Sequence, residues 1–274
     1  MKKRLIQAYF IDLDGTMLDA GEDNGFMSAE NIEFLKELQK TTPVIPSTGR
    51  RPKGAVPQIM KLINAPYAVC STGSVVADPN GEIIHSVNIK NETKNKLLKL
   101  FMDTKLNIII NGADTIYHFG EFNWNKRDWV KRFEKKSYQE IDKNQDIRQF
   151  LIFGLGLEET SNFEKYLNDN YPELATHVVS RGYSIEVTDK SATKGSANKY
   201  VAELLGLDIK KCAHIGDSKN DLLALPYVGY LVAMGNAEAE IKQAASFIGE
   251  DYTNGGLART IQKFEKFIEK TIEN

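Results

Sequence analysis

The stretch Leu5-Ile-Gln-Ala-Tyr-Phe-Ile-Asp-Leu-Asp-Gly-Thr16 decides the fold. Residues 5–13 are mostly apolar and β-prone, which is typical of a strand buried on both faces. Side chains alternate along a strand, so Asp12 and Asp14 lie on one side and Leu13 on the other, while Gly15 lets the chain turn sharply. The stretch therefore predicts a strand of a parallel sheet that ends in two carboxylates, at the edge where open α/β sheets bind ligands.

The residues after this strand alternate between helix and strand patterns. Ser28 is a suitable N-cap, and apolar residues recur every three positions from Ile32 to Leu38, which predicts an amphipathic helix. A strand at 44–48, a helix over 52–64 with an interruption at Pro57, and a strand at 67–70 follow. This order predicts an α/β fold with a Rossmann-like parallel sheet core.

The α/β rhythm breaks after residue 70. Short strands at 75–77 and 82–85 flank Asn80-Gly81, which can supply the positive φ angles of a hairpin turn. An α+β unit is predicted next, with helices at 92–102, 125–135 and 158–168 and strands at 107–110, 115–119, 147–155, 177–180 and 184–187. The α/β pattern then returns, with helices at 194–205 and 220–224 and from 238 and 256, and strands at 212–215 and 230–233. We therefore expect a discontinuous core of residues 1–81 and 189–274 and an inserted α+β cap domain of residues 82–188.

The composition is that of a globular chain. Its 274 residues are 42% hydrophobic and 26% charged, and at about 150 residues per domain the length predicts two domains. The 35 Lys and Arg against 37 Asp and Glu give a net charge of −2, so neither nucleic acid nor an anionic membrane is expected as a partner. No obligate protein partner is evident from the sequence. The basic start is not followed by a signal-peptide segment, which predicts a cytoplasmic location. Cys70 and Cys212 lie beside predicted strands without partners at metal-ligand spacing and fit buried free thiols.

Two further motifs carry groups that bind anions. Ser47-Thr48-Gly49-Arg50 ends the second predicted strand with a hydroxyl, glycine N–H groups and a guanidinium. Thr193-Lys194-Gly195 opens a helix, where an ammonium group and unpaired backbone N–H groups would attract a phosphate. Taken alone, the first motif also fits a polar turn and the second a solvated lysine.

A fourth motif, Ile215-Gly-Asp-Ser-Lys-Asn-Asp221, follows the predicted strand at 212–215. Asp217 lies at the strand end and Asp221 about one helical turn later. One or two carboxylates and several waters are the usual shell of Mg2+, whereas an N-capped helix is the alternative explanation. The four motifs together are more specific than any one, because all fall on the same predicted edge of the sheet.

In motif order the chain resembles the haloacid dehalogenase superfamily of phosphohydrolases. That order is Asp-x-Asp-Gly-Thr, a Ser or Thr at a strand end, a Lys, and Gly-Asp-x-x-Asn-Asp. Three features look like the Cof-like sugar-phosphatase branch. They are the sequence Thr48-Gly-Arg50, the insertion between the second and third motifs, and the sequence Val232-Ala-Met-Gly-Asn-Ala237. Pro46 and Ser71-Thr-Gly-Ser74 depart from the pattern of many relatives.

The resemblance implies a magnesium-dependent phosphatase that acts on a small phosphorylated metabolite, such as a sugar phosphate. Asp12 would attack phosphorus to form an aspartyl-phosphate, and Asp14 would protonate the leaving oxygen and then activate water. Mg2+ would be held by Asp12, the backbone carbonyl of Asp14 and Asp217, with Asp221 supporting that shell. The implied phosphate and substrate contacts are Thr48, Lys194, Arg50, Asn220 and the backbone N–H groups of Leu13 and Gly49.

In that family the inserted cap closes over the core and contributes substrate contacts. Asn111, His118 and Trp124 are candidates here, although surface exposure or local packing explains each of them as well. Trp129 is expected to cover apolar surface. His214 is expected to be buried and hydrogen-bonded rather than a metal ligand, because the metal shell is already rich in oxygen.

Two other functions remain open at this point. A phosphosugar mutase would use the same nucleophile, and it differs in forming an isomer instead of free phosphate. A non-catalytic phosphometabolite-binding protein would bind ligand without turnover, and loss of the acid pair would be its expected mark.

Overall fold

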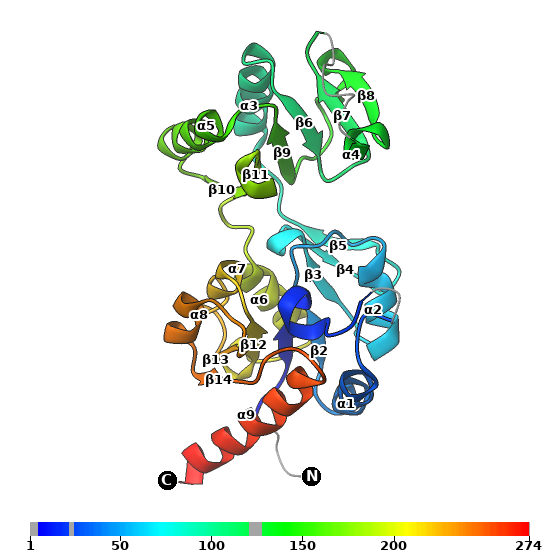
Figure 1. The fold of residues 1–274 in the computed structure, drawn as a ribbon, viewed down its shortest axis with the longest axis vertical. Helices are drawn as coiled ribbons and strands as arrows, with labels where there is room; N and C mark the ends of the chain where they lie inside the picture. The colour runs from blue at the N-terminus through cyan, green and yellow to red at the C-terminus, as the bar shows by residue number, and fades with distance from the viewer. Residues whose placement is uncertain (1–4, 22–24, 121–127, 274) are drawn as a thin grey trace. The chain divides into compact units, whose positions relative to one another are not determined.

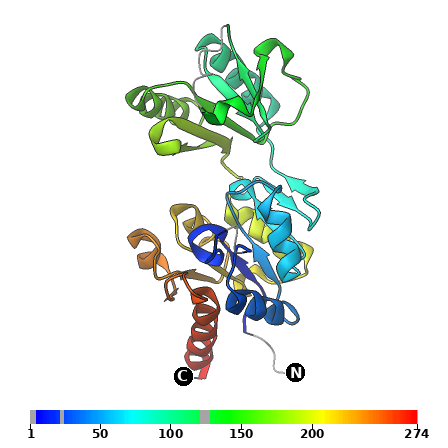
Figure 2. The same cartoon turned by 45° about the vertical axis from the view of Figure 1, so that its right-hand side comes forward.

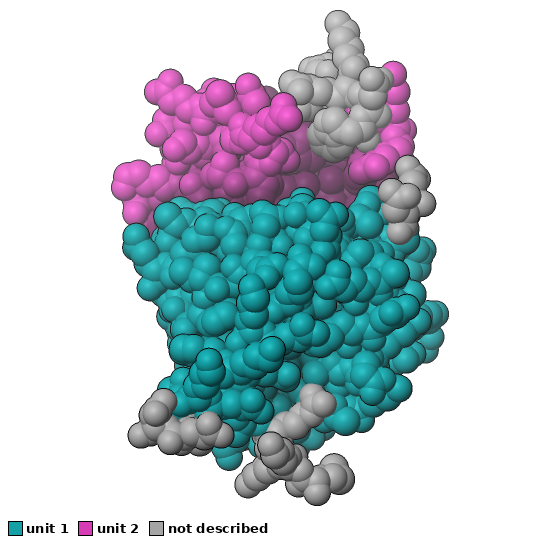
Figure 3. Space-filling view, turned by 60° about the horizontal axis from the view of Figure 1, so that its bottom comes forward, with its two compact units in different colours: residues 1–86, 192–274 teal, residues 87–191 magenta. Residues whose placement is uncertain are grey.

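The computed structural model describes residues 5–21, 25–120 and 128–273. The chain forms two compact units, Met1–Ser86 with Ala192–Asn274, called the core unit below, and Val87–Ser191, called the inserted unit. Figure 3 colours them separately. The chain leaves the core unit after Ser86 and returns to it at Ala192. The first change lies beyond residue 81 because the strand at 83–86 pairs with the strand at 75–77 of the core unit.

The core unit is built on a five-stranded parallel sheet in the order β14-β13-β12-β1-β2 (Figure 1). Its strands are β1 (Tyr9–Ile11), β2 (Val44–Pro46), β12 (Ala213–Gly216), β13 (Tyr230–Ala233) and β14 (Phe247–Ile248). Its helices are α1 (Ala29–Gln39), α2 (Ala55–Ile63), α6 (Lys194–Leu204), α7 (Lys219–Leu222), α8 (Ala239–Ala244) and α9 (Gly256–Glu273). The expected α/β fold with a Rossmann-like parallel sheet is confirmed.

Alternation along β1 places apolar side chains on both faces of this sheet. Tyr9 and Ile11 pack in the cluster that includes residues of α1, α2 and α9. Phe10 packs in a second cluster with Ala197 and Val201 of α6. Helices therefore cover both faces, which is why β1 is apolar throughout.

A small antiparallel sheet continues the core unit beyond β2. It contains β3 (Ala68–Cys70), β4 (Val75–Ala77) and β5 (Ile83–Ser86) in that order. A parallel bridge between Ser47 and Val69 joins it to β2. In the turn before β5, Gly81 alone has positive φ, and the Asp78 carboxylate accepts the backbone N–H groups of Asn80 and Glu82. The expectation that Asn80 also adopts positive φ is wrong.

The predicted interruption of the second helix at Pro57 is also wrong. α2 begins at Ala55, so Pro57 lies in its first turn. Backbone N–H groups of a first turn have no partner within the helix, so proline removes no hydrogen bond there.

The inserted unit is an α+β fold (Figure 2). It contains a six-stranded mixed sheet in the order β10-β11-β9-β6-β7-β8. Its strands are β6 (Asn107–Ile110), β7 (Thr115–His118), β8 (Glu134–Ser137), β9 (Gln149–Phe153), β10 (Leu174–Val179) and β11 (Ser184–Asp189). Its helices are α3 (Asn91–Asp103), α4 (Asp128–Lys131) and α5 (Leu157–Asn170). Residues of α3 and α5 share one apolar cluster with alternate residues of the sheet, such as Ile108 and Phe150.

The helix predicted for 125–135 is corrected by the structure. Its first residues lie outside the described part, the helix ends at Lys131, and Glu134–Ser137 forms the edge strand β8 beside β7. The polar sequence Glu-Lys-Lys-Ser hides this strand, since an edge strand has few buried side chains to give an alternating pattern. The short strand β14 was missed as well.

Cys70 and Cys212 are buried free thiols, and burial raises the pKa of each to about 12. Among the helices of the described residues, none is long and apolar enough to cross a membrane.

Candidate active site

The carboxyl ends of three neighbouring strands carry the polar side chains that the motifs singled out. Asp12 directly follows β1, Thr48 lies two residues after β2, and Asp217 directly follows β12. Because β1 pairs in parallel with both β2 and β12, these ends meet at one edge of the sheet. Lys194 at the start of α6 reaches the same edge, where its Nζ contacts Asp12.

Lys194 lies between two buried carboxylates. Its Nζ is 2.6 Å from Oδ1 of Asp12 and 2.7 Å from Oδ1 of Asp221. Lys194 and Asp221 are 0% exposed and Asp12 is 5% exposed. Burial would lower the pKa of Lys194, but Asp221 and Asp12 outweigh it and raise the pKa, so the ammonium stays charged.

The pKa values of the two carboxylates shift in opposite directions, although burial acts to raise both. Burial raises the pKa of Asp12 to about 7, although Lys194 acts to lower it. Burial would also raise the pKa of Asp221, but Lys194 and His214 outweigh it and hold that pKa well below its usual range. Asp221 is therefore a fixed anion, whereas the charge of Asp12 depends on the cations around it.

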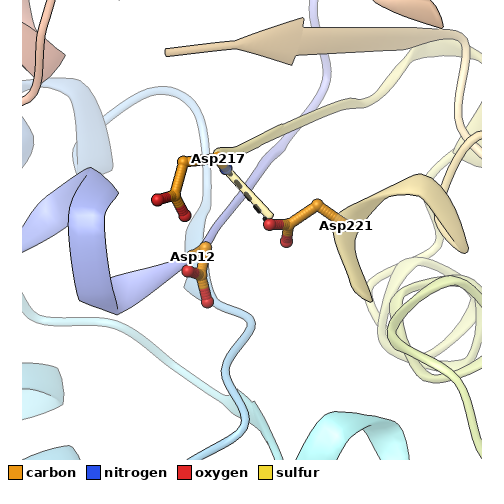
Figure 4. Close-up of side chains that lie close together, drawn as sticks. All are labelled: Asp12, Asp217 and Asp221. Carbon is orange, nitrogen blue, oxygen red and sulfur yellow. Dashed lines mark hydrogen bonds between the residues drawn. The ribbon is translucent and has the colours of Figure 1, made fainter. Parts of the chain in front are cut away.

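Asp12, Asp217 and Asp221 form a cluster of carboxylates (Figure 4). One oxygen of each lies within 4.8 Å of the others. Burial and then Asp221 raise the pKa of Asp217 to about 6. Oδ1 of Asp217 is buried and has no hydrogen-bond partner among the described residues, so this cluster has an unsatisfied acceptor. Such a donor set fits a hard dication such as Mg2+.

Asp221 differs from the other two because both of its oxygens are already engaged. Oδ1 accepts from Lys194 and His214 at 2.7 Å each, and Oδ2 accepts the backbone N–H groups of Asp217 and Ser218 at 3.1 Å each. This geometry favours Asp12 and Asp217 as direct ligands of a cation and Asp221 as their support. Figure 4 draws the bond from the Asp217 backbone to Asp221.

Two glycines allow this close packing, one in the turn after β1 and one at the end of β12. A Cβ on Gly15, which has φ of 74°, would lie 2.3 Å from Oδ2 of Asp217. A Cβ on Gly216 would lie 2.2 Å from Cγ of Asp221. Asn236 adds a further link, since its Nδ2 donates to the carbonyl of Gly15 at 2.8 Å and to Asp217 Oδ2 at 3.4 Å.

Asp14 and Arg50 form a bidentate ion pair at the edge of the site. The Arg50 Nε is 2.9 Å from one Asp14 oxygen and a terminal nitrogen is 2.6 Å from the other. Asp14 is largely exposed, with 59% of its side-chain surface accessible. The motif residues Asp14 and Arg50 thus lie together, which the sequence did not indicate.

The remaining core residues from the motifs lie close in the chain to these groups. Thr48 is buried, its backbone N–H donates to Val69, and its Oγ1 accepts the backbone N–H of Arg50. Leu13 is buried at the turn after β1, and Gly49 follows Thr48. Asn220 lies in α7, where its Oδ1 accepts from the Ser218 hydroxyl at 3.1 Å.

The candidates of the inserted unit show local roles or cannot be compared. Asn111 accepts the backbone N–H of Arg148 at 2.7 Å and donates to the carbonyl of Asp146 at 2.8 Å, which holds a loop together. His118 is half-buried at the end of β7. Trp124 and the side chain of Trp129 lie outside the described residues.

Three buried or half-buried polar residues at the site were not assigned roles from the sequence. His214 was expected only to be buried and hydrogen-bonded, which it is, but its partner Asp221 was not foreseen. Asn198 and Asn236 lie in otherwise ordinary helix and loop segments. The sequence did offer one signal for two of them, because His214 and Asn198 are polar side chains at inward-facing positions of β12 and α6.

Comparisons with known proteins place the chain in a family. Residues 9–261 match the family model of haloacid dehalogenase-like hydrolases. A Haemophilus influenzae protein named as a phosphatase is 29% identical in sequence, and the match covers 97% of this chain and 100% of that protein. A phosphoglycolate phosphatase of Methanothrix thermoacetophila is 26% identical, over 94% and 96%.

The fold has solved counterparts as well. The structure of a subclass IIB sugar phosphatase of the superfamily matches with a TM-score of 0.73 at 19% identity, over 94% of this chain and 98% of its own. The family match spans both segments of the core unit and the inserted unit between them. The chain therefore belongs to the haloacid dehalogenase-like hydrolases, and within their Cof-like branch it is a phosphatase.

Proposed function

We propose that the protein hydrolyses the phosphate monoester of a small metabolite, such as a sugar phosphate, through an aspartyl-phosphate on Asp12, with Mg2+ as cofactor. The observation that carries this proposal is the buried pair of Asp12 and Lys194, 2.6 Å apart, beside the unsatisfied oxygen of Asp217. An anionic nucleophile that faces cations on one side is suited to a phosphoryl group, whose transfer depends on positioning and charge stabilisation.

In the first step, an oxygen of Asp12 forms a bond to phosphorus as the bond from phosphorus to the ester oxygen breaks. Asp14 gives a proton to that leaving oxygen, so the alcohol departs neutral. In the second step, Asp14 takes a proton from a water molecule that attacks the aspartyl-phosphate. Inorganic phosphate leaves and the Asp12 carboxylate is restored.

Arg50 has to move in this mechanism. Its guanidinium donates a hydrogen bond to each oxygen of Asp14, so both oxygens are already engaged. Proton transfer by Asp14 therefore requires Arg50 to release at least one oxygen. The phosphoryl group or a hydroxyl of the substrate would give Arg50 its alternative partner, with Thr48, Lys194, Asn220 and the backbone N–H groups of Leu13 and Gly49 as further contacts.

Asp12, the backbone carbonyl of Asp14 and Asp217 would hold Mg2+, and Asp221 would support them. When bound, the cation withdraws charge from the phosphoryl oxygens. It would also satisfy the buried Asp217 oxygen and keep Asp12 ionised near neutral pH, because burial, only partly offset by Lys194, raises the pKa of Asp12 to about 7.

Release of inorganic phosphate from nitrophenyl phosphate and from a panel of sugar phosphates, nucleotides and vitamin phosphates tests the proposal. We expect turnover that depends on Mg2+ and is abolished in Asp12→Asn, a substitution that preserves shape and removes the nucleophilic charge. Substantial magnesium-dependent hydrolysis by the folded variant would contradict the role of Asp12. Formation of an isomer without phosphate release would instead identify a mutase.

A further inference from the structure

A line of buried hydrogen bonds extends from the carboxylate cluster into the core unit. It runs from Asp221 through His214 of β12 and Asn198 of α6 to Ser47 after β2, with distances of 2.7, 3.0 and 2.9 Å. All four residues are 0% exposed. Four separate segments thus contribute polar side chains to one path, although each polar group must be desolvated to be there.

The donors and acceptors along this path define the state of the His214 ring. The Asn198 side chain donates from Nδ2 to Nδ1 of His214 while its Oδ1 accepts from Ser47, so Nδ1 is an acceptor. The ring proton then lies on Nε2, which donates to Asp221 Oδ1. The opposite tautomer would place a ring lone pair against a carboxylate oxygen. Ser47 and Asn198 therefore select the form of His214 that binds Asp221.

The bond from His214 restricts where Lys194 can bind. Oδ1 of Asp221 accepts from both His214 and Lys194, while Oδ2 accepts two backbone N–H groups. The Ser218 hydroxyl is a fifth donor, 3.3 Å from Oδ2, and with all five in place the Asp221 carboxylate has a single orientation. Lys194 must then approach the remaining side of Oδ1, from which its Nζ also reaches Asp12 at 2.6 Å.

We propose that His214, oriented by Asn198 and Ser47, is a positioning residue that fixes Asp221 and through it aligns Lys194 with Asp12. This inference rests on the proposed phosphatase function of the site. His214 touches neither the substrate nor the cation in this role. Supporting groups that orient the charged residues of such sites typically contribute about 10- to 100-fold to activity or metal affinity.

Two substitutions of similar size separate positioning from packing. His214→Gln keeps an N–H donor toward Asp221, whereas His214→Leu keeps the bulk and removes the donor. Both remove Nδ1, the acceptor for Asn198, and only the Gln variant offers another acceptor, its carbonyl oxygen. We expect kcat for nitrophenyl phosphate to fall about 10- to 100-fold in His214→Leu with little change in KM, and the Gln variant to recover most of it.

The affinity for Mg2+ alone, measured by calorimetry, gives a second readout. Because Asp221 also holds the backbone of Asp217, we expect weaker binding in His214→Leu than in His214→Gln. Circular dichroism confirms folding before either measurement. Equal losses in the two folded variants, or wild-type kcat and Mg2+ affinity in His214→Leu, would overturn the proposal.

A third measurement does not depend on activity or on a cation. Protein with 15N-labelled histidine should show the Nε2–H tautomer for the resonance that disappears in His214→Gln, and Asn198→Leu should disturb that resonance. A Nδ1–H tautomer would overturn the inference even if the enzyme is active. If the wild-type protein hydrolyses no phosphate monoester, the proposed function fails, while the tautomer still decides whether the path exists as described.

Discussion

Replacement of Lys194 by methionine should destabilise the core unit through the two carboxylates that it leaves behind. Methionine preserves the length of the side chain and removes the charge that lies 2.6 Å from Asp12 and 2.7 Å from Asp221. Removal of one partner of a buried ion pair costs about 3–5 kcal/mol. Oxygens of Asp12 and Asp221 lie within 4.8 Å of each other, and at an effective dielectric constant of about 20 two unit charges at that distance repel by about 3 kcal/mol.

We therefore expect Lys194→Met to lower the free energy of unfolding by about 4 kcal/mol at about pH 8 without Mg2+. Urea unfolding followed by far-UV circular dichroism measures this loss. The double variant Asp12→Asn/Lys194→Met is the matched control, because it removes one of the two repelling charges. It should recover part of the loss, and the difference from additivity gives the coupling between the two residues.

Two results would refute this reasoning. A loss below about 1 kcal/mol in Lys194→Met would mean that the carboxylates do not depend on its charge. A double variant less stable than Lys194→Met would mean that packing around the lysine side chain, not repulsion between Asp12 and Asp221, sets the cost.

Three further outcomes follow from the site. Gly216→Ala should lower Mg2+ affinity and kcat at least tenfold, as measured by calorimetry and phosphate release, because its Cβ would lie 2.2 Å from Cγ of Asp221; an unchanged affinity would contradict the packing argument. Asp14→Asn should slow the hydrolysis of alkyl phosphates more than that of nitrophenyl phosphate, since poor leaving groups need the proton most; equal losses would count against Asp14 as the acid. Burial raises the pKa of Asp12 to about 7 and that of Asp217 to about 6, so the folded protein binds more protons than the unfolded chain between about pH 4 and pH 7. Without Mg2+, the contribution of these groups to the unfolding free energy should therefore fall as pH rises through that window, and saturating Mg2+ should reduce the fall. Urea titrations at several pH values measure this dependence, and a flat profile would contradict it.

The sequence predicted the parts of the fold in which a pattern is repeated locally. β1 is apolar on both faces, and α3 and α5 carry an apolar stripe, so periodicity located them within a few residues. β8 was not predicted, because its residues have a low preference for strands and its pairing with β7 exists only after the inserted unit has folded. Tertiary pairing decided the structure there.

The candidate site was predictable to the extent that topology places strand ends together. Asp12, Thr48 and Asp217 each end a strand, and a parallel sheet brings such ends to one edge. The partners of these groups could not be inferred from spacing. Arg50 engages Asp14, and His214 engages Asp221, through contacts that depend on side-chain directions in the folded core unit.

Lys194 shows how a local conflict can indicate function. It occupies the first position of α6, where the positive end of the helix dipole disfavours a cation by about 0.3–1 kcal/mol, and it is fully buried, which disfavours a charge further. A lysine there would be unstable without compensation. Asp12 and Asp221 provide it, and each of them would in turn be costly without Lys194. Three residues that are individually unfavourable in the core are therefore mutually dependent, which is expected where charge is kept for chemistry rather than for stability.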